Sequence, residues 1–382
     1  MKSSSEEDEL KTYKMSGQSA RFLFMRLCIT LFGALIWDLF WLLDEVLYGR
    51  KYRKVSLDDS VFLVGGFRTG TTSLHRAIAL DEERFTSPRF IEIVFPFLTV
   101  QYFFDWLEKR DKKNGTTKIK NIEKKLQDAI GADTMARHPM EWYAAEEDDL
   151  ILASWHYLGW YTLALFPDPE FGVIAGQQTK HSKRVLNRSY IFYKRSLQKF
   201  MYRRGDGRAL LSKSHMIDFM PKLAEELPNA NFVDIIRHPK DSFTSWYGLT
   251  QSSLSFLARN PVDQYVHVKA HLRFWDKFTE SEMNFFVRDV GHGSTYNNRT
   301  LVTFKEYVKD QEATVRKLYA QWGYDVEGTK FEERLIEDRD NHKQYKSNSG
   351  YQNQTLEELG LDESMISERY AEYLSTCHIV DC

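Results

Sequence analysis

Short apolar runs alternate with longer amphipathic segments along most of this chain. Four of the runs have the length and composition of buried strands: 61–64, 209–211, 231–236 and 300–303. Apolar residues recur at helical spacing in the segments 72–80, 217–227, 241–258, 263–286 and 305–322. Strands that alternate with helices predict an α/β fold, in which a central parallel sheet is flanked by helices on both faces. No repeat or long Pro/Gly/Ser linker interrupts residues 55–376, so we expect a single domain there.

The N-terminal residues follow a different pattern. Residues 1–20 contain a serine run and an acidic run without apolar periodicity, which predicts a disordered tail. Residues 21–48 include a stretch, 22–43, whose only charges are Arg26 and Asp38 and whose length is close to that of a membrane-spanning helix. We expect a hydrophobic helix that either anchors the chain in a membrane or docks on its own domain. Docking on a second subunit, which would give a homodimer, is the remaining alternative.

Composition narrows the class of protein. With 382 residues, 42% hydrophobic and 28% charged, the chain has the balance of a globular protein. The formal net charge of -2 gives no general reason to expect a nucleic-acid partner. Three cysteines are too few for a disulfide scaffold or a Cys-rich zinc site. No His, Cys and Asp residues cluster at metal-ligand spacing, so we expect no metal requirement.

Four Asn-x-Ser/Thr sequons bear on localisation; they begin at Asn114, Asn187, Asn298 and Asn353. They favour a glycoprotein with a lumenal catalytic domain on a single-pass Golgi membrane anchor. Cations flank the apolar stretch on both sides, so the positive-inside rule does not fix its orientation. A monotopic protein that faces the cytosol is the alternative.

The strongest motif follows the first predicted strand and reads Gly65-Gly66-Phe67-Arg68-Thr69-Gly70-Thr71-Thr72-Ser73. Its glycines let backbone N–H groups turn toward an anion, and the start of the next helix adds a partial positive charge. The spacing is that of a Walker A loop, except that Thr71 replaces the lysine that reaches the β- and γ-phosphates. Arg68 offers a positive charge three residues earlier. This argues against triphosphate hydrolysis and for a shorter anionic donor.

A second anion-binding pattern lies at the end of the strand 231–236. Arg237 follows this strand, and Ser245 comes eight positions later, one or two turns into the next predicted helix. Arg237 supplies a charged fork and Ser245 a hydroxyl, while the helix start faces the same anion.

Together, the two motifs resemble those of sulfotransferases that use 3′-phosphoadenylyl sulfate (PAPS). Residues 67–72 resemble the family's 5′-phosphosulfate loop, and residues 237–245 its 3′-phosphate motif. The segment 211–215, which contains Lys213, is similar to a Lys-Ser strand end of tyrosylprotein and bacterial members. The resemblance implies a three-layer fold like that of P-loop NTPases. It also implies transfer of a sulfonate from PAPS to a hydroxyl or amine, with release of adenosine 3′,5′-bisphosphate.

The resemblance also implies site residues. The cofactor-binding residues would be Arg68, Thr69, Gly70, Thr71, Thr72, Ser73, Arg237 and Ser245. Negative charge builds on the bridging oxygen during sulfuryl transfer, so we expect Arg68 and Lys213 to act as catalytic cations. For Lys213, a solvated lysine at a strand end is the alternative.

The resemblance places a catalytic base after the first helix, where Glu92 lies among apolar residues that should raise its pKa. The alternative for Glu92 is a structural carboxylate paired with Arg89, and His138 and His215 are competing bases.

Other features leave alternatives open. The acidic run 146–149 lies between aromatic stretches, and we expect a solvated face there, with a wall of the acceptor pocket as the alternative. The acceptor itself is not specified, because carbohydrates, peptidyl tyrosine, sterols and small phenols all present a hydroxyl. Two other functions compete with sulfonate transfer: a P-loop nucleotide kinase or triphosphatase, and a non-catalytic, membrane-tethered nucleotide-binding protein.

Overall fold

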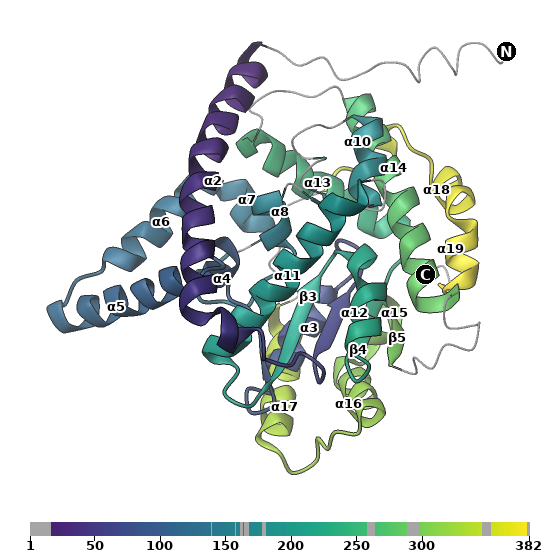
Figure 1. Ribbon diagram of the computed structural model, residues 1–382. Coiled ribbons are helices and arrows are strands. Elements are labelled where there is room, and N and C mark those ends of the chain that lie inside the picture. Colours follow the sequence, from purple (N-terminus) through teal and green to yellow (C-terminus); the bar gives the residue numbers. More distant parts are fainter. Residues whose placement is uncertain are drawn as a thin grey trace.

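A central sheet organises the computed structural model (Figure 1). The structure describes residues 17–138, 140–156, 158–160, 163, 168–177, 181–257, 264–288, 298–345 and 353–379. Five parallel strands are arranged in the order β2-β3-β1-β4-β5. They are β1 (Val61–Val64), β2 (Phe85–Thr86), β3 (Ala209–Ser214), β4 (Asn231–Ile236) and β5 (Arg299–Thr303). The predicted parallel sheet is confirmed; β2 escapes prediction because two residues are too few to give a pattern.

Alternate residues of the strands face two separate cores. Phe62 and Val64 of β1 belong to one buried cluster, whereas Val61 and Leu63 belong to the other. The first cluster is covered by α11 (Lys183–Arg204), α12 (Met220–Glu226), α13 (Pro239–Leu257) and α14 (Gln264–Met283). The second is covered by α3 (Thr71–Ala79), α15 (Phe304–Lys309), α16 (Gln311–Trp322) and α17 (Lys330–Tyr345). Both faces of the sheet are therefore buried, which explains why its strands read as continuous apolar runs.

An N-terminal helix and a helical hairpin lie to one side of this core. Helix α2 (Gly17–Tyr52) runs along the body, and α5 (Leu98–Asn114) and α6 (Lys118–Ile130) project away from it (Figure 1). The buried Asp44 of α2 accepts hydrogen bonds from the backbone N–H groups of Leu98 at 2.7 Å and Thr99 at 2.9 Å. The same carboxylate pairs with Lys199 Nζ of α11 at 3.0 Å. One buried carboxylate therefore joins three helices.

The aromatic side chains of α2 strengthen this docking. The Trp37 ring stacks on Phe97 with centroids 4.6 Å apart, and Lys199 Nζ lies 3.4 Å from the centroid of the Trp41 ring. Within the described part of the chain, no helix is both long and apolar enough to cross a membrane. The predicted disordered tail falls largely on residues 1–16, which lie outside the described residues.

Shorter helices complete the described structure. They are α4 (Phe90–Val94), α7 (Ala132–Arg137), α8 (Leu150–His156), α10 (Pro169–Gly176), α18 (Glu363–Arg369) and α19 (Ala371–Thr376). Three short turns of other helical types occur at η2 (Ile217–Phe219), η3 (Asn284–Arg288) and η4 (Glu357–Leu359). Helix α18 packs on α13 and α19 packs on α14, so the C-terminal segment covers the helices that follow β4.

Candidate active site

The loop after β1 has the backbone of an anion cradle. Gly70, at the start of α3, has a φ of 106°, and a Cβ there would come within 2.9 Å of the Phe304 ring. Arg68 also has a positive φ, 62°, which is uncommon for a residue other than glycine. The first N–H groups of α3 have no partner inside the helix and add to its positive end. The predicted loop therefore has the shape and the polarity to hold a phosphate.

The loop after β1 and the motif after β4 meet at the carboxyl ends of these two strands. Strands β1 and β4 are direct neighbours, with Val61 opposite Asn231. Arg68 Nε donates a hydrogen bond to Ser245 Oγ at 2.8 Å, and Arg237 Nη1 donates to the Arg68 carbonyl at 3.2 Å. The Arg237 guanidinium also lies 4.3 Å from the centroid of the Phe304 ring. Two cations and a hydroxyl, from motifs far apart in the sequence, thus lie together at the carboxyl ends of β1 and β4.

Lys213 lies on the other side of the loop, on β3, which pairs with β1 through Lys213 and Leu63. Its Nζ donates to Thr72 Oγ1 at 2.7 Å and to Glu147 Oε1 at 2.6 Å. The residue is 1% exposed, so the alternative of a solvated lysine is wrong. Burial beside a loop hydroxyl places the Lys213 cation against the start of α3, where an anion would lie.

The acidic run 146–149 is buried, so the expectation of a solvated face is wrong. Asp148 donates its backbone N–H to the Lys213 carbonyl at 2.9 Å, and its carboxylate accepts from Tyr193 at 2.6 Å. Glu147 pairs with Lys213. These partners lie on β3 and α11, more than forty positions away at the nearest. Burial raises the pKa of Asp148 to about 7 and that of Asp149 to about 6, whereas Glu147 is paired with a lysine that no local pattern in the sequence could have named.

A chain of ionisable groups continues from Lys213 through Glu147. The other Glu147 oxygen lies 3.4 Å from His215 Nε2, while His215 Nδ1 donates to the Gly65 carbonyl at 2.6 Å. Burial alone would raise the pKa of Glu147, but the charges of Lys213 and His215 hold this pKa well below its ordinary value. Burial opposes the charged form of His215 too, yet Glu147 raises the pKa of this imidazole above its usual value. Glu147 is therefore a carboxylate, held ionised beneath the loop.

A neighbouring group, His138 with Glu146 and Glu147, has the residue types of a metal site. Their ligand atoms all lie within 4.8 Å of one another. However, Glu146 Oε1 already lies 3.1 Å from His138 Nε2, and Glu147 is bonded to the Lys213 ammonium. A dication here would face the Lys213 charge, so these residues do not fit a metal ion.

The structure places Glu92 in a different environment from the loop. Its Oε1 accepts from Arg203 at 2.5 Å, and its Oε2 accepts from Arg204 and from the Arg89 backbone N–H, both at 2.9 Å. Among the contacts of the described residues, none joins Glu92 to Arg68 or Lys213. The alternative for Glu92 is a structural carboxylate paired with Arg89. The structure shows ion pairs of Glu92 with Arg203 and Arg204 of α11 instead. The catalytic role of Glu92 stays a prediction.

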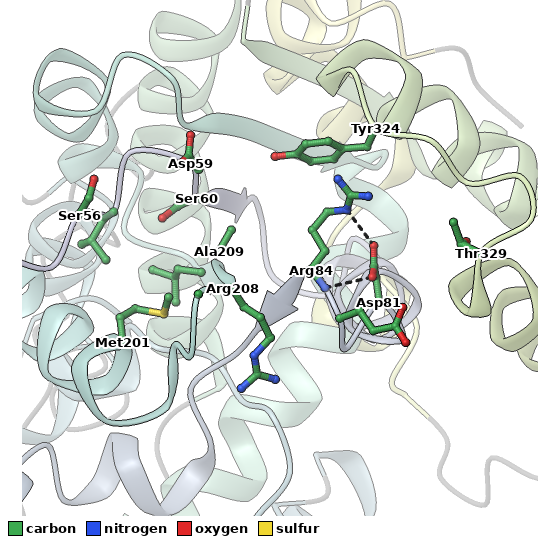
Figure 2. Close-up of a pocket in the computed structure, with 14 residues that line it drawn as sticks. Ser56, Asp59, Ser60, Asp81, Arg84, Met201, Arg208, Ala209, Tyr324 and Thr329 are labelled. Carbon is green, nitrogen blue, oxygen red and sulfur yellow. Dashed lines mark hydrogen bonds and ion pairs between the residues drawn. The ribbon is translucent and has the colours of Figure 1, made fainter.

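An open pocket of about 450 Å³ lies at the amino ends of the strands, at the other end of the sheet from the loop 65–73 (Figure 2). Ser60, Arg84 and Ala209 line it, and they lie at the amino ends of β1, β2 and β3. Arg84 is already paired with Asp81 there, at 3.2 Å. Ligands of parallel α/β sheets bind at the carboxyl ends of the strands, so this pocket is separate from the candidate active site.

Comparison with known proteins bears on these observations. The chain is 24% identical over 326 residues to omega-hydroxy-beta-dihydromenaquinone-9 sulfotransferase Stf3 of Mycobacterium bovis and of Mycobacterium tuberculosis, covering 80% of this chain and 73% of each relative. Among solved structures, sulfotransferase STF1 of M. tuberculosis aligns with a TM-score of 0.64 and 18% identity, over 89% of this chain and 83% of that one. Sulfotransferase STF9 of Mycobacterium avium aligns with a TM-score of 0.61 and 18% identity, over 86% and 79%.

These relatives are bacterial and lend no support to a Golgi glycoprotein, which stays a prediction. Their fold agrees with the parallel sheet and its flanking helices. The profile of the sulfotransferase family matches residues 60–328, from the last residue before β1 to the turn before α17. Both anion-binding motifs and Lys213 lie within this match, and the chain belongs to the sulfotransferase family.

Proposed function

We propose that the chain transfers the sulfonate of PAPS to an acceptor hydroxyl or amine and releases adenosine 3′,5′-bisphosphate. The observation that carries this proposal is the contact between Arg68 of the loop and Ser245 of the second motif. A donor that has phosphates on both the 5′ and the 3′ positions would need two such elements side by side. ATP and ADP have no 3′-phosphate for Arg237 and Ser245 to bind, so a nucleotide kinase or triphosphatase is disfavoured.

The residues of the two motifs divide the binding of the donor between them. Thr69, Gly70, Thr71, Thr72 and Ser73 would hold the 5′-phosphate through the loop and the start of α3. Arg237 and Ser245 would bind the 3′-phosphate, and Arg68 would lie between the two anions, since its side chain touches Ser245. The chemistry of this donor set, cations and hydroxyls at a helix start, fits a bisphosphorylated nucleotide.

Lys213 is placed to stabilise the charge that develops in the reaction. Its ammonium touches Thr72 from the side of the loop opposite Arg68. In the proposed transfer, the acceptor oxygen forms a bond to sulfur while the bond from sulfur to the phosphate oxygen breaks. The electron pair stays on that phosphate oxygen, where the Lys213 and Arg68 cations would lower the energy of the transition state.

For the acceptor proton we propose Glu147, assisted by His215. Glu147 is ionised, is 8% exposed and touches Lys213, whereas the described contacts of Glu92 join it to Arg203 and Arg204 and not to Lys213. A general base must come within hydrogen-bond reach of the group that it deprotonates. A base that touches Lys213 can meet this condition, because the same lysine would contact the sulfonate.

The relatives suggest the kind of acceptor. The name of Stf3 describes action on an omega-hydroxy menaquinone, a hydroxyl on an apolar molecule. We therefore propose a hydroxyl on an apolar acceptor for this chain, which favours a sterol or a small phenol over a carbohydrate or a peptidyl tyrosine. Golgi localisation and a homodimer stay predictions.

A thermal-shift titration of the full chain tests the donor. Adenosine 3′,5′-bisphosphate should raise the Tm, because a ligand at about 100 times its Kd adds about 2.7 kcal/mol to the free energy of unfolding. ADP should raise the Tm by less. Arg237→Ala should abolish the difference between the two ligands, while Arg76→Ala, an exposed cation of α3, should keep it. Stabilisation by ATP with Mg²⁺ that does not depend on Arg237 would sink the proposal.

A further inference from the structure

Helix α2 presents an apolar face that no part of the described structure covers. Its opposite face carries Trp37, Trp41 and Asp44, which pack on α5 and α11. The uncovered face consists of Leu35, Ile36, Leu39, Leu42, Leu43, Val46 and Leu47, each 38% exposed or more. Leu35 and Val46 reach 71% and 74%. Seven large aliphatic side chains on one helix face are more than the scattered single residues that ordinary surfaces show.

Helix α5 continues this surface with aromatic residues. Tyr102, Phe103 and Trp106 are all exposed, and the Tyr102 ring lies 5.6 Å from the Tyr48 ring of α2. Trp106 stacks on Phe103 with centroids 5.7 Å apart, and the Arg110 guanidinium lies 5.3 Å from the Trp106 ring. Exposed Trp and Tyr beside cations are typical of side chains at a membrane–water interface.

The hairpin formed by α5 and α6 carries an excess of cations. Residues 98–130 contain eight Lys and Arg residues against five acidic ones, a net charge of +3 in a chain whose net charge is -2. Asp111 and Glu123 are engaged inside the fold: Asp111 accepts from the Ile119 N–H at 3.0 Å, and Glu123 accepts from the Trp142 N–H at 2.8 Å. Asp105 pairs with Arg203 of α11, and Glu108 pairs with Lys112 at 3.1 Å. The remaining cations leave the hairpin with a net positive charge.

We infer that α2 and the α5–α6 hairpin form a docking surface for a membrane that contains anionic lipids. The aliphatic face of α2 and the ring of Trp106 would enter the headgroup region, with α2 lying in the plane of the membrane. Lys112, Lys113 and their neighbours would meet the lipid phosphates, each basic residue strengthening the attraction. From Trp37 onward α2 cannot be surrounded by lipid, because its other face is fixed to α5 and α11 through Asp44.

A second copy of the chain fits this surface less well. A two-fold interface uses the same patch on both subunits, so the cations of both hairpins would be brought into one interface. A bilayer instead offers an apolar interior and anionic headgroups together. Docking would also bring an apolar acceptor to the enzyme; this last point rests on the proposed function, whereas docking itself does not.

Vesicle flotation of the full chain tests the inference. The protein should float with vesicles of phosphatidylcholine and phosphatidylglycerol but not with phosphatidylcholine alone, and salt should weaken binding. Leu39→Glu/Val46→Glu should abolish flotation. Lys112→Ala/Lys113→Ala should lower the partition coefficient by about 30-fold, the effect of two basic residues.

Met365→Glu is the matched control, because Met365 is a 55% exposed apolar residue on α18, outside the docking surface. This control variant should float like the unaltered chain. All of the variants should have the same Tm as the unaltered chain. Equal flotation of Leu39→Glu/Val46→Glu, or no flotation with anionic vesicles, would overturn the inference. So would a dimer in light scattering that this double variant dissociates, since a second copy would then cover the face.

The inference and the proposed function can fail separately. Binding of adenosine 3′,5′-bisphosphate and sulfonate transfer to a water-soluble phenol are measured without vesicles. The double variant Leu39→Glu/Val46→Glu should retain both. Flotation without transfer would remove only the proposed function, and transfer without flotation only the docking surface.

Discussion

Arg68 donates a 2.8 Å hydrogen bond from its Nε to the Ser245 hydroxyl, a contact between residues 177 positions apart. It exists because β1 and β4 are neighbours in a parallel sheet, so that the loops at their carboxyl ends must meet. The contact couples the loop for one phosphate to the motif for another.

Ser245→Ala should weaken binding of adenosine 3′,5′-bisphosphate by about 10- to 100-fold, the effect of one hydrogen bond to a charged group. Binding of ADP, which lacks the 3′-phosphate, should change less. Isothermal titration calorimetry measures both affinities. Ser252→Ala is the control, because that hydroxyl donates to the Leu249 carbonyl of the same helix at 2.8 Å. Equal losses for the two ligands would contradict the assignment of Ser245.

Glu147→Gln should lower kcat by at least about 100-fold, because the variant keeps the shape of the side chain but loses the proton acceptor. Binding of adenosine 3′,5′-bisphosphate should stay within a few-fold, which shows that the site still forms. Steady-state kinetics and calorimetry give the two numbers. A kcat close to that of the unaltered chain would remove Glu147 as the base.

Glu92→Gln should act mainly on stability. The change leaves Arg203 and Arg204 without a buried carboxylate, which should cost about 3 kcal/mol in the free energy of unfolding, while kcat changes little. Urea denaturation and initial rates measure the two effects. If kcat collapses while the urea midpoint stays put, Glu92 is the base after all.

The Lys213–Glu147 pair should show strong coupling in a double-mutant cycle. Lys213→Met and Glu147→Gln should each destabilise the fold by about 3 kcal/mol, because each leaves a buried partner unpaired. The loss of stability in the double variant should be smaller than the sum of the two single losses, by about 1–3 kcal/mol. Urea denaturation at neutral pH measures all four proteins, and strictly additive losses would show that the pair is not coupled.

A second buried pair predicts the pH dependence of stability. Asp234 and Glu282 are both buried, and burial raises the pKa of each carboxyl. Repulsion from Glu282 adds to the rise for Asp234, which is large, whereas Asp234 opposes the rise for Glu282. A group whose pKa is raised by folding favours the folded state below its unfolded pKa, about 4 for a carboxyl, and loses this contribution as pH rises toward its folded pKa.

Asp234→Asn removes one of these carboxyls. Relative to the unaltered chain, the variant should therefore gain stability as pH rises above about 4, the unfolded pKa of a carboxyl. Urea denaturation at a series of pH values measures the difference. A constant difference across this range would mean that the pair does not hold its proton.

The sequence predicts local geometry better than it predicts partners. The loop 65–73 and the motif 237–245 could be located because their function depends on short spacings along one strand–helix junction. The burial of Lys213 and of the acidic run could not, because their contacts, such as Glu147 with Lys213 and Tyr193 with Asp148, come from other elements. Glu92 shows the same limit: its neighbours in the sequence are apolar, yet its oxygens meet two arginines of α11.

The link from Asp44 to Lys199 also bears on how the chain is made. Helix α2 leaves the ribosome early, but the lysine that neutralises Asp44 follows about 150 residues later, which takes about 10 to 30 seconds at ordinary rates of synthesis. During this interval both faces of α2 are exposed, the one that later packs on α11 and the one that stays exposed, and both can contact other molecules. In the docking that we infer, a nascent chain held at a bilayer would be protected from aggregation until α11 is synthesised.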